Sequence, residues 1–461
     1  MAKDFRTEKD SMGELNVPID ASWGAQTQRA INNFPISGLT MPSDFIKALA
    51  LIKSVSAHAN GKLGLINQEV ASAIEKASIQ IFNGDLLDQF PVDIFQTGSG
   101  TSTNMNMNEV IANVANSMSA VNIHANDHVN YGQSSNDVIP TAINLSASIA
   151  IESKLISSIT YLIQVIEDKA KKSNKIVKTG RTHLMDAMPI RFDQELSGWS
   201  QQLKHGKSRI TSSLKRLKQL PIGGTAIGTG INASPDFSKI FINKINNILE
   251  SSYSVSDNYF EGISSQDTSV EVSGHLKTLS VSLMKISNDL RWMNSGPLTG
   301  LSEITLPALQ PGSSIMPGKI NPVIPESVAM ASAQVIGNDT TITIAGQSGN
   351  FQLNVMLPVI AYNLLQSIDI ISSSSKNLAD AAIKDFSINV SNIENALALN
   401  PILVTALNPV IGYDKSAAIA KKAFAEKRPI LDVAIEDSGL TKQELEKLLD
   451  ASELTKGGIK G

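Results

Sequence analysis

The 461-residue chain contains no cysteine, which excludes disulfide bonds, thiolate zinc sites, a cysteine nucleophile and cysteine-ligated iron–sulfur clusters. Charged residues make up only 18% of the chain, and the formal net charge is −4. A nucleic-acid-binding protein normally carries a basic surplus or a basic stripe, and membrane-surface helices are rich in lysine and arginine as well. The composition therefore argues against both classes.

Long apolar runs are also missing. No continuous run of 18 apolar residues occurs, so we expect no transmembrane helix. The first residues, MAKDFRTEKDSMGE, lack the apolar centre of a signal peptide and contain the acidic residues that transit peptides avoid. Together with the missing cysteines, these features predict a cytoplasmic protein. Hydrophobic residues nevertheless amount to 42% of the chain, which is enough to build a large core.

Glycine and proline are absent from two long stretches, Thr141–Thr179 and Val359–Asn400. In a third, His275–Ser295, apolar residues recur at 3-4-3-4-3 spacing, which is typical of the seam of a packed helix. These residues are Leu276, Leu279, Leu283, Ile286, Leu290 and Met293. A helix of about 40 residues would be roughly 60 Å long. The sequence therefore predicts a mainly α fold with a long bundle or a helical oligomer core, in which Ser372–Ser375 faces solvent.

Three domains are expected from the distribution of helix breakers. Residues 1–137 are richer in breakers and hold several polar loops, residues 138–393 form the long-helix region, and residues 394–461 form a small domain of short helices. Near the end of the chain, Thr441 and Glu444 have the spacing of a capping box, which predicts the start of the last helix.

Two glycine-containing loops offer backbone amides. In TGSGTSTNMNMNE (97–109), the glycines let amides approach a ligand, and Ser99 and Thr101 add hydroxyl groups, although a surface turn before a helix would look the same. The loop GGTAIGTG (223–230) lacks the Lys-Ser/Thr pair of a phosphate-binding loop, so a nucleotide site is not expected there.

A third loop, HANDHVNYGQSSND (124–137), combines charged and neutral donors. Asp127 lies between His124 and His128, but no second ligand cluster accompanies them, so a metal site is not favoured. The neutral hydrogen-bonding residues of this loop are Ser134, Ser135 and Asn136.

Two further loops hold candidate proton-transfer groups. In GRTHLMDAMP (180–189), His183 is the side chain type that titrates near neutral pH, although a histidine at a loop edge is most often structural. In GSSIMPGKINPVIPE (312–326), two glycines bracket two serines and a lysine, and a carboxylate closes the run. Taken together, the loops suit a small anionic substrate and proton transfer without a cofactor.

These motifs resemble the fumarase/aspartase superfamily. The segment GSSIMPGKINP is similar to its signature loop, and GSGTSTNMNMNE, QSSND, GRTHLMDA and GGTAIGTG resemble its other motifs. The resemblance runs from Met12 to at least Ala423, through the closing TALNPVIGYDKSAAIAKKA. Gly318 before the signature lysine and Ser135 in QSSND are most similar to the class II, iron-independent fumarate hydratases.

The resemblance implies three mainly α domains, a homotetramer with a twenty-helix core, and active sites shared by three subunits. It also implies reversible hydration of fumarate to (S)-malate in the tricarboxylic acid cycle, with no metal and no other cofactor. The expected partners are a small dicarboxylate substrate and further copies of the chain, not nucleic acid or a membrane.

Roles follow from motif position in the superfamily. The resemblance implies that Ser313 is the base, that His183 belongs to the acid side with Glu326 as its partner, and that Lys319 and Asn321 bind a substrate carboxylate. The remaining substrate-binding residues that it implies are Ser99, Gly100, Thr101, Ser134, Ser135, Asn136, Thr182, Ser314 and Ile320.

A second dicarboxylate site is implied for His124, Ala125, Asn126 and Asp127. Many fumarases have an arginine three residues before this histidine, whereas this chain has Val121. Binding at the second site is therefore expected to be weaker or absent.

Two alternative functions remain open from the sequence. Aspartate ammonia-lyase would use the same scaffold, although Gly318 and Ser135 argue against it. An inactive structural relative is the second alternative, although all five of the residues with implied roles in proton transfer and carboxylate binding are present.

Overall fold

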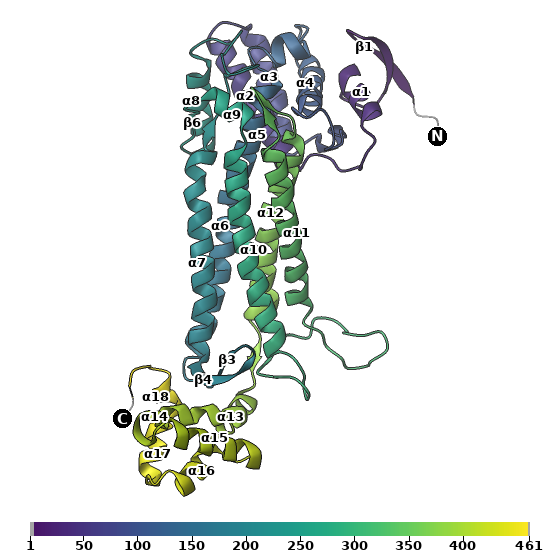
Figure 1. Cartoon of the computed structure of the whole chain (residues 1–461). Coiled ribbons are helices and arrows are strands. Elements are labelled where there is room, and N and C mark those ends of the chain that lie inside the picture. Colours follow the sequence, from purple (N-terminus) through teal and green to yellow (C-terminus); the bar gives the residue numbers. More distant parts are fainter. Residues whose placement is uncertain (1–3, 460–461) are drawn as a thin grey trace. The chain divides into compact units, whose positions relative to one another are not determined.

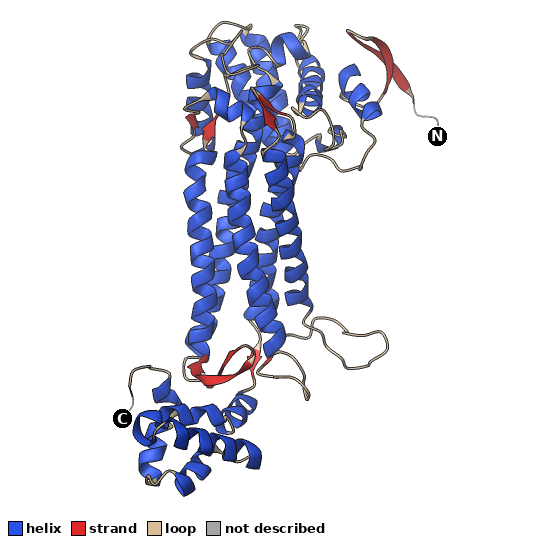
Figure 2. Ribbon diagram, viewed as in Figure 1, coloured by secondary structure: helices blue, strands red, loops and turns tan. Residues whose placement is uncertain are grey.

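The computed structural model describes residues 4–459, and the described chain is built mainly from helices with short two-stranded sheets between them (Figure 2), so the mainly α prediction is confirmed. Met1–Lys3, part of the N-terminal segment considered above, lie outside the described residues. The strands, labelled as in Figure 1, are β1 (Phe5–Asp10), β2 (Gly13–Pro18), β3 (Val177–Thr182), β4 (Met185–Arg191), β5 (Gln219–Leu220), β6 (Ser254–Val255), β7 (Ile304–Thr305), β8 (Gly349–Asn350), β9 (Leu353–Asn354) and β10 (Ser387–Ile388).

The pairs β1–β2, β3–β4, β7–β10 and β8–β9 are antiparallel, and β5–β6 is parallel. The α-helices are α1 (Ala25–Asn33), α2 (Ser43–Lys62), α3 (Gln68–Asn83), α4 (Thr101–Asn116), α5 (Ser135–Ala150), α6 (Ile156–Lys172), α7 (Phe192–Leu217), α8 (Phe237–Leu249), α9 (Tyr259–Ser264), α10 (Asp267–Met293), α11 (Val323–Gly346), α12 (Leu357–Leu378), α13 (Val390–Ala398), α14 (Asn408–Ile411), α15 (Tyr413–Glu426), α16 (Ile430–Asp437), α17 (Lys442–Leu448) and α18 (Ala451–Leu454). Shorter 3-10 or π segments are η1 (Leu87–Gln89), η2 (Ala125–Val129), η3 (Ile151–Leu155), η4 (Ala379–Ile383) and η5 (Pro401–Leu407).

The chain divides into two compact units, each assembled from three separate segments. Unit 1 consists of Met1–Ser157, Gly206–Ser280 and Ala333–Ser372, and unit 2 consists of Ser158–His205, Val281–Ser332 and Ser373–Gly461. The helices α6, α7, α10, α11 and α12 have residues in both units. Unit 1 holds the loops around Ser99 and Ser134, and unit 2 holds those around His183 and Ser313.

Helix α10 confirms the apolar seam predicted for His275–Ser295. All six apolar residues at the 3-4-3-4-3 positions are at most 3% exposed within the single chain. Burying one such side chain typically contributes about 1.5–3 kcal/mol. Apolar side chains that remain exposed in this chain include Val281 of α10 and Met330 and Ile344 of α11, which are 54%, 70% and 52% exposed.

The stretch Ser135–Lys172 contains α5, η3 and α6, and an 18-residue window in it has a mean hydropathy of 1.4. By length and composition alone this stretch could cross a membrane, a test that the core helices of soluble proteins also pass. The sequence criterion missed it because the stretch is not continuously apolar. The expectation that the chain has no transmembrane helix is not tested by this finding, which concerns length and composition alone.

The breaker-free stretch Val359–Asn400 is not one helix. It contains most of α12, then η4, β10 and α13. Ser372 and Ser375 are 6% and 0% exposed, so the expectation that this serine run faces solvent is wrong for these two. The hydroxyl of Ser372 donates to the carbonyl of Ile368 at 2.6 Å. A serine hydroxyl in a helix can thus donate to a carbonyl of the preceding turn, which lowers the free-energy cost of burying it.

The C-terminal helices share a separate hydrophobic cluster. Its members are Leu403, Val404, Leu407, Ile419, Ala423, Ile430, Val433, Ala434 and Leu445. The predicted capping box is present at the start of α17, where Thr441 and Glu444 cap each other's backbone amides. The predicted last helix is divided into α17 and α18, and Asp450 caps the second piece.

Candidate active site

His183 lies at the tip of the β3–β4 hairpin. His183 and Leu184 form the two-residue connection, and their φ angles are 57° and 59°. Two-residue hairpin turns favour positive φ, but the preferred residues are asparagine and glycine. A side chain with a Cβ atom costs roughly 1–2 kcal/mol in this left-handed conformation. The turn therefore holds an exposed imidazole in a strained position, and strain of this kind is often found at functional sites.

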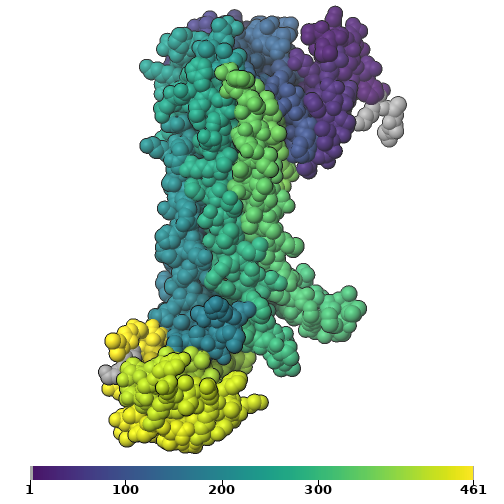
Figure 3. All heavy atoms as spheres, in the orientation of Figure 1, coloured from purple at the N-terminus to yellow at the C-terminus, as the bar shows by residue number. Residues whose placement is uncertain are grey.

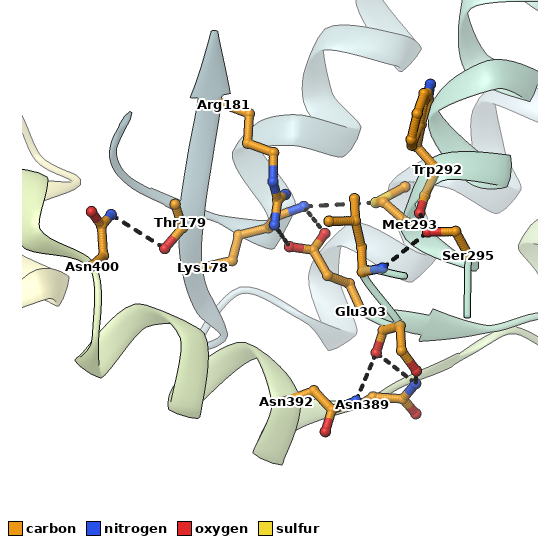
Figure 4. A network of polar contacts seen from close by, with 12 residues as sticks. Lys178, Thr179, Arg181, Trp292, Met293, Ser295, Glu303, Asn389, Asn392 and Asn400 are labelled. Atoms are coloured by element: carbon orange, nitrogen blue, oxygen red, sulfur yellow. Dashed lines mark hydrogen bonds and ion pairs between the residues drawn. The ribbon is translucent and has the colours of Figure 1, made fainter. Parts of the chain in front are cut away.

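A buried network of charges holds strand β3 in place below this turn (Figure 4). Lys178, which is 1% exposed, donates to Glu303 at 2.6 Å and to Glu195 at 2.7 Å. The other carboxylate oxygen of Glu303 accepts from Arg181 at 2.7 Å. Arg181 directly precedes Thr182 and His183. Glu303 thus connects two cations of β3 with the segment that follows α10.

The backbone of Glu303 is fixed as well. Its N–H donates to the carbonyl of Met293 at 2.8 Å, and its carbonyl accepts from the N–H of Asn389 at 2.8 Å. The side-chain amides of Asn389 and Asn392 donate to the carbonyl of Ser302 at 2.9 and 3.1 Å. These bonds anchor the backbone of Glu303, so its carboxylate is a fixed partner for Lys178 and Arg181 of β3.

Replacing Glu303 with glutamine should destabilise unit 2 because it leaves the buried Lys178 with only the partly exposed Glu195 as an ionic partner, and the partly exposed Arg181 beside a neutral amide. Removing one partner of a buried pair typically costs about 3–5 kcal/mol in the free energy of unfolding. Glu195→Gln is the matched control, since Glu195 is 23% exposed and its loss leaves Lys178 paired with Glu303; it should cost about 1 kcal/mol. Urea unfolding of both variants measures the difference, and equal losses would contradict this role of Glu303.

The signature loop is closed by its own hydrogen bonds. The N–H of Gly312 donates to the carbonyl of Lys319 at 2.7 Å, and the side-chain amide of Asn321 donates to the carbonyl of Gly312 at 2.7 Å. A Cβ atom at Gly312 would lie 2.4 Å from the Lys319 carbonyl oxygen, so this closure requires glycine. The ammonium group of Lys319 donates to Asn321 Oδ1 at 2.7 Å. The two predicted carboxylate-binding residues therefore lie together.

The Ser313 hydroxyl oxygen accepts two backbone N–H groups inside this loop. They come from Met316 at 3.1 Å and from Ile315 at 3.3 Å. Donors of this kind stabilise negative charge on an oxygen atom. The local geometry therefore favours a serine that can lose its proton.

A pocket of about 660 Å³ adjoins the signature loop in unit 2. Four predicted site residues line it: Lys319, Ile320, Asn321 and Glu326. Arg291 adds a second cation to the lining, which favours an anionic ligand. Within the described chain, His183, Thr182, Ser313 and Ser314 do not line this pocket, and no hydrogen bond or ion pair joins His183 to Glu326. Figure 3 shows that the segment between α10 and α11, residues 294–322 of unit 2, projects from the surface.

In unit 1, the predicted residues Ser99 and Gly100 precede α4, and Thr101 is its first residue. Gly100 has a φ of 74°, and the hydroxyl groups of Ser99 and Thr101 are 2.7 Å apart. A Cβ atom at Gly98 would lie 1.8 Å from the carbonyl oxygen of Val355. The glycines are therefore explained by close packing and backbone conformation, not only by access of amides to a ligand.

The QSSND loop begins α5 with a capping box between Ser134 and Asp137. The Asp137 carboxylate is fully buried and accepts the N–H groups of Gly223 and Thr225, both at 2.9 Å. Burial raises the pKa of Asp137 even though these N–H groups oppose the shift. The side-chain amide of Asn136 donates to the carbonyl of Ala226 at 2.7 Å. The glycine-rich loop thus supports the predicted substrate loop.

A second pocket, of about 630 Å³, brings Ser134 together with Asn126 and Asp127 of the predicted second site. Asp127 also contacts His124, whose Nδ1 lies 3.2 Å from the Asp127 carboxylate. Val121, three residues before His124, is exposed and carries no charge. Among the described residues, no group of three or more histidine and acidic side chains is arranged to hold a metal ion.

Two buried lysines in this structure were missed by the sequence analysis. Lys178 and its partner Glu303 support the hairpin, and Lys53 lies on α2 beneath the QSSND loop. The available signal was a lone charge within an apolar run, as in ALALIKSVS. That signal does not name the partner, because the partners are distant in sequence.

Two known families match most of the chain. The family described as "Lyase" matches residues 13–337, and the family described as "Fumarase C C-terminus" matches residues 403–456. A protein of Xylella fastidiosa named "Fumarate hydratase class II" is 55% identical over 99% of this chain and 96% of its own length. One of Pseudomonas aeruginosa, named "Fumarate hydratase class II 2", is 55% identical over 99% of this chain and all of its own length.

Solved structures agree with these matches. The crystal structure of a class II fumarase from Schistosoma mansoni superposes with a TM-score of 0.94, at 38% identity, over 98% of this chain and 99% of its own. A fumarate lyase:delta crystallin from Brucella melitensis bound to cobalt superposes with a TM-score of 0.93, at 40% identity, over 98% of this chain and its own full length.

Proposed function

Because the chain belongs to the fumarase/aspartase superfamily and, within it, to the class II fumarate hydratases, we propose that Ser313, His183 and Glu326 carry the reversible hydration of fumarate to (S)-malate. The chain is a hydro-lyase of this class, and what is proposed is how its residues perform the reaction. The observation that carries the assignment is the Ser313 oxygen, which accepts two backbone N–H groups in a loop closed by Asn321.

In the direction of malate dehydration, the base removes a weakly acidic C–H proton next to a carboxylate. A serine hydroxyl is a poor base unless its alkoxide is stabilised. The N–H groups of Ile315 and Met316 supply that stabilisation here. Proton removal places additional negative charge on the neighbouring carboxylate, which therefore needs fixed donors.

Lys319 and Asn321 are the proposed donors to that carboxylate. They lie in one pocket, and preorganised donors at such a site are typically worth about 3–4 kcal/mol each in transition-state stabilisation. Ser314 and Ile320 belong to the same loop. We propose Ser99, Gly100, Thr101, Ser134, Ser135, Asn136 and Thr182 as the residues that complete the substrate site.

His183 is proposed to protonate the departing hydroxide, with Glu326 orienting the imidazole. His183 and Glu326 do not contact each other in the described chain, so the pairing requires that they come from different subunits of an assembly. We propose a homotetramer with shared sites. The relatives support an oligomeric enzyme that acts on small dicarboxylates.

Three further proposals complete this assignment. The reaction needs no metal and no cofactor, since a serine, a histidine and fixed donors supply its proton transfers and charge stabilisation. The second dicarboxylate site at His124, Ala125, Asn126 and Asp127 binds weakly, because Val121 carries no charge. The enzyme is proposed to act in the cytoplasm, within the tricarboxylic acid cycle, and the chain is proposed to consist of three domains, 1–137, 138–393 and 394–461.

The assay that tests this function follows the absorbance of fumarate after (S)-malate is added to purified, chelator-treated protein. Fumarate should form from malate, and aspartate in the same assay should give none. Formation of fumarate from aspartate would identify an ammonia-lyase. No fumarate from either substrate, with the protein folded, would identify an inactive relative. Activity that chelator removes and a divalent ion restores would contradict the metal-free mechanism.

A further inference from the structure

Lys53 is fully buried, and within the described chain it forms no ion pair with a carboxylate. It lies in the apolar middle of α2 and is 0% exposed. Its ammonium group donates to Asn130 Oδ1 and Gln133 Oε1, both at 3.0 Å. Both acceptors are neutral amides. Burying a charge without an oppositely charged partner lowers the stability of the folded state. Such a residue is therefore a candidate for a functional role.

The two acceptors lie in the loop that leads to the predicted substrate residues. Asn130 and Gln133 both line the 630 Å³ pocket, as do Tyr131 and Ser134. The side-chain amide of Asn130 donates to the Gln133 carbonyl at 3.1 Å, which closes the loop on itself. Lys53 therefore binds two residues that line this pocket, Asn130 and Gln133.

A chain of hydrogen bonds continues from Lys53 to Ser135. The Asn130 Oδ1 atom that accepts from Lys53 also accepts from the side-chain amides of Asn104 and Asn108 of α4, both at 3.2 Å. The amide of Asn104 donates in turn to the Ser135 hydroxyl oxygen at 3.1 Å. The Ser135 oxygen thus accepts a hydrogen bond from inside the protein, and the hydroxyl group keeps its own proton to donate to an anion.

The electrostatic environment of Lys53 suits an anionic ligand. Burial lowers the pKa of Lys53 to about 7, against the opposing attraction of the Asp137 carboxylate. The Asp137 carboxylate is itself engaged by three backbone N–H groups. A dicarboxylate bound above the loop would add negative charge to that of the Asp137 carboxylate.

We propose that Lys53 is a positioning residue for the reaction, which fixes the loop from Asn130 to Ser135 and thereby directs the Ser134 and Ser135 hydroxyls toward a bound dicarboxylate. This inference rests on the proposed function. Lys53 acts through Asn130 and Gln133 and does not itself touch the reacting atoms.

The test replaces Lys53 with methionine, which keeps the length of the side chain and removes its charge and donors. Replacing a buried charge with an apolar residue of similar size is commonly tolerated by folding. The KM for fumarate should rise roughly tenfold to a hundredfold, because a loop that binds substrate loses a charged hydrogen bond, while kcat changes severalfold at most. Lys53→Gln, which retains a neutral donor, should recover part of the KM.

The matched control is Ile52→Ala, which removes a neighbouring fully buried side chain of α2. It should lower the melting temperature without raising KM. In a Ser135→Ala background, Lys53→Met should raise KM by a much smaller factor, since the hydrogen-bond chain already lacks its end.

An unchanged KM in Lys53→Met, or a KM effect equal to that of Ile52→Ala, would overturn the inference, and so would full additivity with Ser135→Ala. Should Lys53→Met not fold, Asn130→Ala carries the test, because it removes the shared acceptor and should raise KM similarly. Failure of the wild-type protein to convert fumarate would instead overturn the proposed function.

Discussion

Replacing Ser313 with alanine should lower turnover by about 10²–10⁴-fold, the usual contribution of a general base. The reason is that the two backbone N–H groups of Ile315 and Met316 stabilise an oxygen that the variant lacks. The loop should keep its shape, because its closure depends on Gly312, Lys319 and Asn321. Steady-state kinetics should therefore show a large fall in kcat and little change in substrate affinity.

The neighbouring serine provides a matched control for that variant. Ser314 is exposed and is proposed to bind substrate, so Ser314→Ala should act mainly on KM. Light scattering should show the same assembly for the wild type and for both variants. A Ser313→Ala enzyme with a turnover near that of the wild type would contradict the assignment of the base.

Mixing two inactive variants should restore activity. Chains with Ser313→Ala and chains with His183→Asn should each be nearly inactive alone. If the two residues of one site come from different subunits, random reassembly leaves roughly a quarter of the sites with neither substitution, because each of the two contributions is intact half of the time. Dissociation, mixing and reassembly, followed by the malate assay, measures this recovery.

The same experiment has two controls. Each variant dissociated and reassembled alone should stay inactive, and exchange of subunits should be verified with a size or mass label. No recovery after verified exchange would show that Ser313 and His183 of one site belong to the same chain. A fully active monomer in analytical ultracentrifugation would also contradict shared sites.

The parts of this fold that were predicted from the sequence are those determined by local pattern. The seam of α10 depends only on the spacing of apolar residues, and all of its members are buried. The capping box at Thr441 depends on two residues three positions apart. The signature loop was identified as one unit because its closing contacts lie within ten residues.

The parts that were missed depend on contacts between distant segments or on tertiary context. Lys178 and Glu303 are separated by 125 positions, and Lys53 and Gln133 by 80. The spacing of apolar residues in a sequence does not predict contacts between residues so far apart. The burial of Ser375 and the end of α12 before β10 were missed for a related reason, since a polar run and a breaker-free run are compatible with more than one packing.

The closed signature loop affects the free energy of binding. Ordering a flexible backbone costs about 1–2 kcal/mol for each residue, and a ligand that organises a disordered loop loses that much affinity. Here the bonds from Gly312 to Lys319 and from Asn321 to Gly312 already restrict the chain before any substrate arrives. Pro311 and Pro322 restrict φ on either side. The chain therefore presents a preorganised segment, and the interaction energy of a small dicarboxylate remains available for the reaction itself.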